Sequence, residues 1–438
     1  MTWRRSAVGG RRSAVTVVQT AGMTPMTDLS AHDIALSDPE LWARPDAERD
    51  AVFATLRRDL PISWHAEPLF EENPPGPGYW AVTRFDDVRK ASRNPELFIS
   101  GKGVNIGDMP VEISEFFGSM IAMDAPRHSK LRSIVQKAFT PRNIAQIEAH
   151  IATKATEIID AVAPKGEVDF VSEIAAQLPL QVICEMMGIP ASQHQRVFEL
   201  TNVILGVGAP EYAQTLDELM AAALELYQLA MELGERRLAD PVDDLTSALM
   251  HAEVEGERIT TQEFGSFFIL LVVAGNETTR NAISHGMKAL TDHPDQRAAW
   301  AADFWGVAPT AVEEIVRWAT PVIHFRRTAS RDTELGGQAI AEGDKVVLWY
   351  ASANRDESHF VDPFRFDVRR AGNDHVGFGA GGPHFCLGAN LARREITVMF
   401  DELFRRLPDL EVTGEPAMLQ SAFIHGIKRM PCAFTPAR

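Results

Sequence analysis

The sequence predicts a mainly α-helical protein with a smaller β region, an α+β fold in one large domain over 27–438. Apolar residues recur with a helical period over 142–252 and again over 260–290. Strand-like runs are few and short, and the clearest are 79–85, 324–328 and 345–350. The 438 residues contain no Pro/Gly/Ser-rich linker, internal repeat or low-complexity tract that would divide the chain.

The composition excludes several classes of protein. A formal net charge of −17 argues against nucleic acid or an anionic membrane surface as the main partner. The longest apolar run, 267–274, is too short to span a bilayer. Cys184, Cys386 and Cys432 have no paired spacing, which excludes a disulfide framework and a CxxC zinc site. This cysteine usage is typical of the reducing cytoplasm, where we expect the protein.

Residues 1–26 differ from the rest of the chain. They are rich in arginine and contain no acidic residue, and their apolar stretch at 14–18 is too short for the core of a signal peptide. We expect a disordered extension. Alternatively, translation begins at Met23 or Met26.

The first part of the domain, 27–100, is expected to combine short helices with the strand 79–85. Asp86 and Asp87 are expected to open a helix, because acidic side chains favour a helix N-terminus. An irregular segment follows at 101–123, and a loop of this length is usually either functional or disordered.

A helix is predicted directly after this loop, with Asp124 as its N-cap and Pro126 in its first turn. His128 and Arg132 stand four residues apart and therefore share one face of that helix. Two such hydrogen-bond donors suit a pair of anionic groups on one ligand. A plain surface pair is the alternative interpretation of these two residues alone.

The segment 142–252 is predicted to be helical throughout. Its breaks are expected at 188–190, at 206–210 and at 240–241, where glycine and proline residues interrupt the pattern.

The next helix is long. Thr260 and Glu263 form a capping box, and periodic apolar residues continue to Leu290, which is about thirty residues or roughly 45 Å. The run 267–274 is apolar on every face, so this part of the helix is expected to be buried.

Polar residues follow this apolar run, in the sequence Gly275-Asn276-Glu277-Thr278-Thr279. They are poor choices for a buried helix, and such local conflicts are expected at functional sites. Gly275 would leave room beside the helix, Thr278 would bond back to a carbonyl, and Glu277 would supply protons next to a ligand. The alternative is a kinked core helix with a satisfied carboxylate.

A helix over 309–319 is expected to begin at Pro309, and in it Glu314 and Arg317 have the spacing of an ion pair. Such pairs contribute little when they lie on a surface. Gly336-Gly337 marks a turn between strands, and 419–430 is predicted to form a final apolar hairpin.

The segment 377–388 reads Gly-Phe-Gly-Ala-Gly-Gly-Pro-His-Phe-Cys-Leu-Gly, and its glycines and proline exclude regular structure before Leu387. Cys386 is then expected at a helix N-terminus, where the partial positive charge favours a thiolate. The glycines allow the backbone to lie close to a large flat group. A thiolate held in this way suits an axial ligand of haem iron, and the alternative is a buried cysteine on a glycine-rich turn.

Together these motifs resemble the cytochrome P450 superfamily of haem-thiolate monooxygenases over 27–438. The resemblance rests on four motifs: the cysteine loop, the segment 274–279, Glu314-x-x-Arg317, and Pro363-x-Arg365-Phe366. It implies the fold of that family, which is mainly α with a smaller β region and forms a single haem-binding domain.

The resemblance also implies roles for individual residues. Cys386 would be the proximal ligand of the iron of haem b, and Glu277 with Thr278 would be the catalytic acid–alcohol pair that delivers protons. The other haem-binding residues that it implies are His128, Arg132, Ala274, Gly275, Arg327, Phe378, His384 and Gly388. The implied structural triad that supports the cysteine loop is Glu314, Arg317 and Arg365. The loop from Phe378 to Cys386 is one residue longer than is usual in the family.

Three segments, 267–286, 348–359 and 425–428, resemble actinobacterial and especially mycobacterial lipid hydroxylases. This implies hydroxylation at the terminal (omega) carbon of methyl-branched fatty acids or isoprenoids. The residues expected to line the apolar substrate tunnel include Phe267, Leu271, Val322 and Phe423. A steroid or cholesterol side-chain hydroxylase of the same fold is the alternative.

The expected partners are molecular oxygen, an apolar lipid, a ferredoxin and a ferredoxin reductase, because the chain contains no flavin or nucleotide motif of its own. Four basic residues are expected to form the ferredoxin-docking patch, namely Arg127, Lys130, Arg393 and Arg394. A peroxide-driven enzyme and a non-catalytic haem-binding sensor are the other interpretations.

Overall fold

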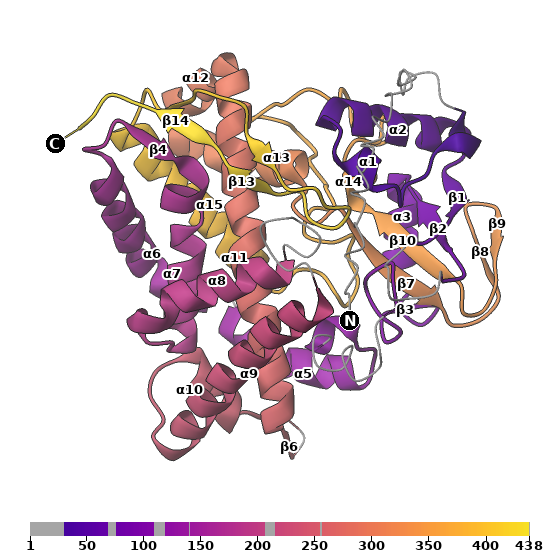
Figure 1. Ribbon diagram of the computed structural model, residues 1–438, viewed down its shortest axis with the longest axis horizontal. Coiled ribbons are helices and arrows are strands. Elements are labelled where there is room, and N and C mark those ends of the chain that lie inside the picture. Colours follow the sequence, from indigo (N-terminus) through magenta and orange to yellow (C-terminus); the bar gives the residue numbers. More distant parts are fainter. Residues whose placement is uncertain are drawn as a thin grey trace, which may run out of the picture.

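The computed structural model describes residues 30–68, 76–108, 119–139, 141–205, 215–254 and 256–437. A large helical part lies beside a smaller part built around a β-sheet, as Figure 1 shows. The expected extension at 1–26 lies outside the described residues, as do the break expected at 206–210 and part of the loop 101–123.

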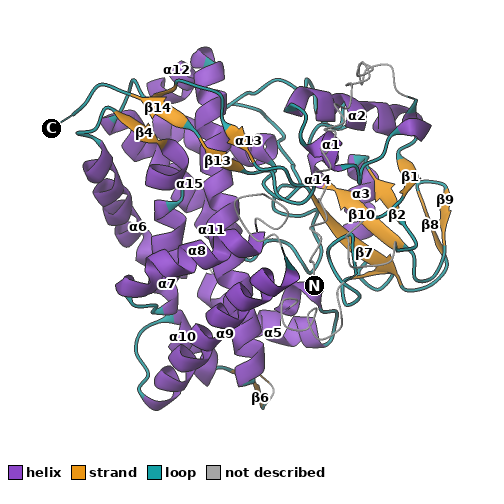
Figure 2. Cartoon of the chain, viewed as in Figure 1, coloured by secondary structure: helices purple, strands orange, loops and turns teal. Residues whose placement is uncertain are grey.

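Helices make up most of the described chain, as the purple ribbon in Figure 2 shows. The α-helices are α1 (Pro39–Trp42), α2 (Asp46–Asp59), α3 (Phe85–Ser92), α5 (Arg127–Val135), α6 (Pro141–Val162), α7 (Gln177–Met187), α8 (His194–Leu205), α9 (Leu216–Ala239), α10 (Leu245–His251), α11 (Thr261–Asp292), α12 (Pro294–Ala302), α13 (Phe304–Ala319), α14 (Tyr350–Ala353) and α15 (Ala389–Arg406). The shorter helical segments are η2 (Ala31–Asp33), η3 (Ser119–Ala122), η4 (Gln136–Phe139), η5 (Val171–Ala175) and η6 (Ala191–Gln193).

The strands form a main sheet and several small ones. They are β1 (Ile62–His65), β2 (Tyr79–Val82), β3 (Phe98–Ile99), β4 (Glu167–Asp169), β5 (Glu253–Val254), β6 (Glu257–Arg258), β7 (His324–Ala329), β8 (Thr333–Leu335), β9 (Gln338–Ile340), β10 (Lys345–Trp349), β11 (Glu411–Val412), β12 (Ala417–Met418), β13 (Ile427–Arg429) and β14 (Pro431–Ala433). The main sheet has the order β1-β2-β10-β7-β3, and β11-β14-β4 form a second sheet.

The three strands predicted from the sequence are confirmed as β2, β7 and β10, which are neighbours in the main sheet. β10 pairs in parallel with β2 and antiparallel with β7. Every residue of β10 is buried, including Lys345, whose ammonium lies 2.7 Å from the carboxylate of Glu67. The pairing of Val346 with Arg327 sets the position of that arginine in β7.

The long helix α11 is the central element of the helical part. The predicted capping box is confirmed, with Thr260 and Glu263 each satisfying the backbone N–H of the other. In Figure 1 this helix runs nearly the full height of the molecule, and it packs against α7, α8, α9, α13 and α15. Because its partners come from so many parts of the chain, α11 is surrounded for most of its length.

Two of the expected helix ends in the segment 142–252 are confirmed. α7 stops at Gly188, which adopts a left-handed conformation with a φ of 73°, and α9 stops at Asp240. A further interruption was not predicted: β4 and the η5 turn separate α6 from α7.

Two expected helix starts are wrong. Asp124 does not cap α5, because its carboxylate accepts hydrogen bonds from the backbone N–H groups of Ser100 and Gly101, both at 2.8 Å. Helix α13 begins at Phe304 and contains Pro309, because the side chain of Asp303 caps the N–H of Gly306 and starts the helix earlier.

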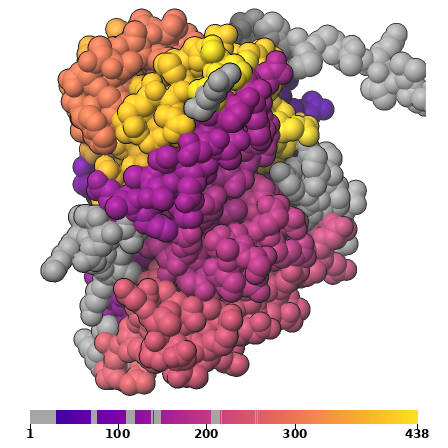
Figure 3. All heavy atoms as spheres, turned by 90° about the vertical axis from the view of Figure 1, so that its left-hand side faces the viewer, coloured from indigo at the N-terminus to yellow at the C-terminus, as the bar shows by residue number. Residues whose placement is uncertain are grey.

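Figure 3 shows one face of the molecule, on which α6 lies between the C-terminal strands and α10. Within the described ranges, no helix is both long and apolar enough to cross a membrane.

Candidate active site at the cysteine loop

The cysteine loop has a backbone that only glycine accommodates easily. Gly379, Gly381 and Gly382 have φ values of 94°, 85° and 83°. A Cβ atom at Gly382 would lie 2.4 Å from the carbonyl oxygen of Ser92 in α3. The extra residue of this loop is therefore accommodated by left-handed glycines packed against α3.

Cys386 lies just before α15, whose N-cap is Gly388. Its backbone N–H donates to the carbonyl oxygen of Phe378 at 2.9 Å, so Phe378 remains next to the cysteine despite the longer loop. Part of Cys386 is exposed. Within 4 Å of Gly388 there is nothing that a Cβ atom would meet.

The surroundings of Cys386 shift the pKa of its thiol in both directions. Desolvation by the surrounding protein raises the pKa of the thiol, while the N–H of Gly388 and the charges of Arg132 and Arg393 act in the opposite direction. Coordination to a metal ion deprotonates a thiol outright. A bound metal ion would therefore stabilise the thiolate form of Cys386.

A cluster of basic side chains from three parts of the chain surrounds the cysteine loop. His128 and Arg132 come from α5, Arg327 comes from β7, and His384 comes from the loop itself. The rings of His128 and His384 lie 4.2 Å apart, and Arg132 donates to the carbonyl oxygen of Phe385 at 2.6 Å. The structure thus brings together four residues that the sequence analysis proposed as one binding group.

The electrostatics of this cluster favour an anionic ligand. Burial, together with the nearby Arg327, His128 and Arg132, lowers the pKa of His384 to about 3. Burial and Arg132 also lower the pKa of His128, whose buried Nε2 has no hydrogen-bond partner among the described residues. A group with two carboxylates would satisfy these donors, and a haem group with its two propionates fits this requirement.

Two of the predicted residues on α11, Ala274 and Thr278, are not buried by other parts of the described chain. Ala274 is exposed and Thr278 is partly exposed, although most of this helix is buried. The hydroxyl of Thr278 donates to the carbonyl oxygen of Ala274 at 2.8 Å, as predicted, and the helix continues without a break. Gly275 does not open the space that was expected, because a Cβ atom there would meet Ile183 at 3.5 Å, an ordinary contact.

Glu277 is buried and its carboxylate is paired with Arg280 one turn further along α11. Arg280 in turn donates to the side-chain oxygen of Asn202 in α8 at 2.9 Å. The second carboxylate oxygen of Glu277 is buried without a partner among the described residues. A buried carboxylate with one free oxygen can accept and release a proton to water that reaches it.

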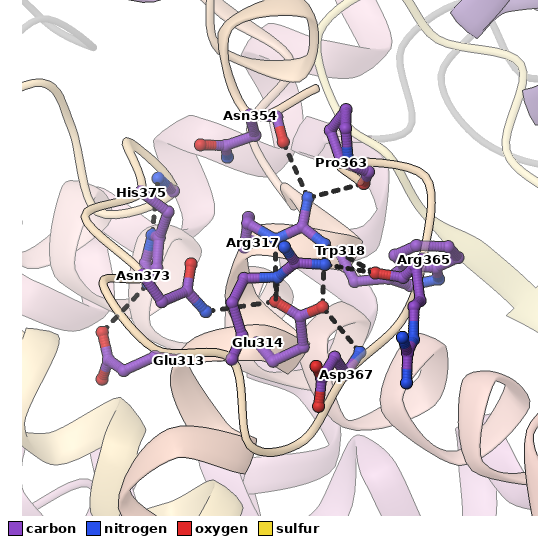
Figure 4. Close-up of polar contacts among 12 residues, drawn as sticks. Glu313, Glu314, Arg317, Trp318, Asn354, Pro363, Arg365, Asp367, Asn373 and His375 are labelled. Carbon is purple, nitrogen blue, oxygen red and sulfur yellow. Dashed lines mark hydrogen bonds and ion pairs between the residues drawn. The ribbon is translucent and has the colours of Figure 1, made fainter. Parts of the chain in front are cut away.

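The predicted ion pair between Glu314 and Arg317 is confirmed, and it is fully buried rather than on the surface. Figure 4 shows the two side chains facing each other. Nε of Arg317 lies 2.7 Å from Oε2 of Glu314. The expected third member of the triad, Arg365, is wrong. Its side chain is exposed and it contributes only its carbonyl oxygen, whereas Arg370 donates to Glu314 at 3.0 Å. The loop after Pro363 folds back so that the side chain of Arg370 points to Glu314. The short motif Pro363-x-Arg365-Phe366 could not predict this, because Arg370 lies outside it.

The expected substrate residues form two groups. Phe267 and Leu271 are buried on α11, at positions whose spacing places them on the face of Ala274 and Thr278. Val322 and Phe423 belong to a second cluster, in which Val322 pairs with Ile424 across a β-bridge.

The sequence analysis missed Glu395 on α15. This carboxyl group is buried and accepts a hydrogen bond from Thr279 of α11, and burial raises its pKa to about 8. The sequence could have pointed to Glu395, because a glutamate among the apolar residues of a predicted helix is unusual.

Two cavities lie away from the cysteine loop. One of about 640 Å³ lies beside β4 and β14, and one of about 40 Å³ lies beside α2. Neither is lined by the predicted site residues.

A helical protein that holds a haem group over a cysteine loop is the class that this fold and these side chains define. The family model that matches the chain is described as "Cytochrome P450" and covers residues 307–418.

Curated relatives match nearly the whole chain. "Methyl-branched lipid omega-hydroxylase" of Mycobacterium bovis is 54% identical over 94% of this chain and 97% of the relative. "Steroid C26-monooxygenase" of Rhodococcus jostii is 41% identical over 92% of this chain and 84% of the relative.

Among solved structures, a Mycobacterium marinum cytochrome P450 in complex with pseudoionone is 46% identical with a TM-score of 0.88. That likeness covers 92% of this chain and 98% of the other. The chain belongs to the cytochrome P450 family. It is accordingly a monooxygenase that binds haem b, with the mainly α fold that the sequence predicted.

Proposed function

We propose that the protein hydroxylates the terminal carbon of methyl-branched lipids, such as branched fatty acids or isoprenoids. The observation that carries this proposal is the 54% identity over 97% of the length of the methyl-branched lipid omega-hydroxylase. The apolar residues Phe267 and Leu271 on the α11 face of Thr278 support it, because such a wall recognises shape rather than polar groups.

In this proposal Cys386 ligates the iron, and His128, Arg132, Arg327 and His384 hold the two propionates. When bound, haem supplies the activation of molecular oxygen that allows one oxygen atom to be inserted into a C–H bond. Thr278 and Glu277 would pass protons to the reacting oxygen on the face of α11 that carries Ala274 and Thr278. Glu314, Arg317 and Arg370 would keep the cysteine loop in place.

We further infer that a ferredoxin delivers the electrons at the patch formed by Arg127, Lys130, Arg393 and Arg394. Arg127 is the most exposed of the three arginines, and each of them pairs with a carboxylate, so the patch is partly neutralised. Replacing Arg127 and Lys130 by glutamate should slow reduction by ferredoxin without changing substrate affinity. Unchanged reduction rates in stopped-flow measurements would move the docking site elsewhere.

We infer a location in the reducing cytoplasm from the unpaired spacing of the three cysteines in the sequence.

The experiment that tests the proposal combines spectra with product analysis. The purified protein is reduced under carbon monoxide, and Cys386→Ser serves as the control that should lose the red-shifted Soret band of a thiolate-ligated haem. The oxidised protein is then titrated with a methyl-branched fatty acid, the straight-chain acid of equal length and cholest-4-en-3-one. A low-to-high-spin shift and a terminal alcohol only from the branched acid would support the proposal.

Steroid side-chain hydroxylation is the second candidate, because the steroid C26-monooxygenase of Rhodococcus jostii is 41% identical. Turnover of the steroid with a higher kcat/KM than the branched acid would favour it and overturn the lipid proposal. Product formation that needs reductant would also exclude a non-catalytic sensor.

A further inference from the structure

Glu313 of α13, the residue before the buried Glu314, contacts two side chains on either side of the cysteine loop. Its Oε1 lies 2.5 Å from Nε of Arg393, and its Oε2 lies 3.2 Å from Nη2 of the same guanidinium. Oε2 also lies 2.9 Å from Nε2 of His375. Burial raises the pKa of Glu313, but His375 and Arg393 outweigh burial and lower it to about 2.

The histidine contact reaches the start of the loop. Nδ1 of His375 accepts a hydrogen bond from the backbone N–H of Gly377 at 3.0 Å. Since Nδ1 is an acceptor, the ring proton lies on Nε2 and is donated to Glu313. Figure 4 shows His375 pointing toward Glu313.

The arginine contact reaches the cysteine itself. The guanidinium carbon of Arg393 lies 4.5 Å from the centre of the Phe378 ring, and the carbonyl of Phe378 accepts the N–H of Cys386. The charge of Arg393 also acts on the sulfur of Cys386. One carboxylate therefore holds Gly377 through a histidine and Phe378 through an arginine.

We propose that Glu313 is a positioning residue that sets the electric field on the sulfur side of the haem, by holding Arg393 against Phe378 and by partly cancelling its charge. The proposal does not depend on the substrate, since these residues lie around the ligand loop. The two neighbouring glutamates would then have different roles. Glu314 holds the segment 363–373 through its hydrogen bonds, whereas Glu313 acts on the cysteine loop.

Electrostatics gives the direction of the effect. Reduction of the haem adds one negative charge beside Cys386, so a nearby positive charge favours it and a nearby negative charge opposes it. Replacing Glu313 by glutamine keeps an acceptor for His375 but leaves the charge of Arg393 uncompensated. Replacing Arg393 by glutamine has the opposite effect on the charge.

The test is the midpoint reduction potential of the purified holoprotein, measured by spectroelectrochemical titration without a redox partner. Glu313→Gln should raise the potential, Arg393→Gln should lower it, and Glu313→Asp should leave it near the wild-type value. The matched control is Glu148→Gln. Glu148 pairs with Arg394, the residue next to Arg393 in the sequence, and the charge of Arg394 is not expected to act on the sulfur of Cys386.

Shifts of opposite sign for Glu313→Gln and Arg393→Gln, both larger than that of the control, would support the proposal. Shifts of the same sign, or a Glu313→Gln shift no larger than that of Glu148→Gln, would overturn it. If Glu313→Gln does not retain haem, the potentials of Arg393→Gln and Glu313→Asp are compared with the wild type instead. A lower potential in Arg393→Gln with a near wild-type value in Glu313→Asp supports the proposal, and an unchanged potential in Arg393→Gln overturns it.

Discussion

Glu314 is bonded to more groups than a single ion pair would require. Its two oxygens accept hydrogen bonds from Arg317, Arg370, Asn373 and the backbone N–H of Asp367. Arg317 then donates to the carbonyls of Asn354 and Pro363. Because all of these charges are buried, removing one partner leaves another uncompensated.

The first prediction concerns Arg370, the second arginine of this network. Arg370→Ala should lower the free energy of unfolding by about 3 kcal/mol, because Glu314 loses a buried cationic partner. The measurement is urea denaturation followed by tryptophan fluorescence. Arg365→Ala is the control and should change the free energy by less than about 0.5 kcal/mol, since that side chain is exposed. A larger loss for Arg365→Ala would restore it to the network.

Thr278 carries the second prediction. Thr278→Ala should lower the yield of hydroxylated product per reductant consumed by about tenfold or more, because a proton donor beside the reacting oxygen is lost. Thr291→Ala is a matched control on the same helix, where the hydroxyl also bonds back one turn, to Met287 at 3.1 Å. Equal yields in Thr278→Ala and the control would remove Thr278 from the proton path.

At the scale of the element, α11 combines a single uninterrupted helix with several glycines. Gly286 faces α13 and α15, where a Cβ atom would lie 3.0 Å from both Ile315 and Phe400. Gly275 faces Ile183 at 3.5 Å, which is an ordinary contact distance. Of these two glycines, only Gly286 is approached closely enough to require the absence of a side chain.

The third prediction compares these two glycines. Gly275→Ala should be neutral or raise the free energy of unfolding by up to about 1 kcal/mol, because alanine has the higher helix propensity. Gly286→Ala should lower it by about 1–3 kcal/mol, because the added methyl overpacks a dense contact. Both changes can be followed by urea denaturation. Equal effects would show that packing around α11 adjusts more freely than the distances suggest.

At the scale of the whole molecule, segments far apart in the sequence converge on the proposed haem site. α5 supplies His128 and Arg132, β7 supplies Arg327, and the loop before α15 supplies Cys386. The contact between Thr279 and Glu395 ties α11 to α15 behind this loop. The pKa of Glu395, raised to about 8, links this packing to the pH dependence of stability.

The fourth prediction follows from that link. In the folded protein Glu395 keeps its proton up to about pH 8, whereas the unfolded chain releases it near its ordinary pKa of 4.5. Since the folded state binds more protons between these values, stability should fall as pH rises from 4.5 to 8. Glu395→Gln should remove this contribution and be more stable than the wild type at pH 8, by a few kcal/mol. Parallel stability curves for the two proteins across this range would contradict the expectation.

The sequence by itself determined the features that depend on near neighbours in the chain. Helix geometry alone defines contacts between residues three or four positions apart. Such contacts include the capping box of Thr260 and Glu263, the ion pair of Glu314 and Arg317, and the hydrogen bond from Thr278 to the carbonyl of Ala274. The glycines before Cys386 likewise predicted an irregular loop, and Gly379, Gly381 and Gly382 have the positive φ values of such a loop.

Only the tertiary structure decided which distant side chains meet. Arg370 takes the place expected for Arg365, Asp124 caps the segment at Ser100 instead of α5, and Glu313 reaches both His375 and Arg393. Glu395 likewise becomes a neutral buried acid only because α11 packs over it. These contacts depend on where loops bring segments far apart in the chain, and residue spacing carries no information about that. Burial then decides the charge of each group, because desolvation acts only once the surrounding segments are in place.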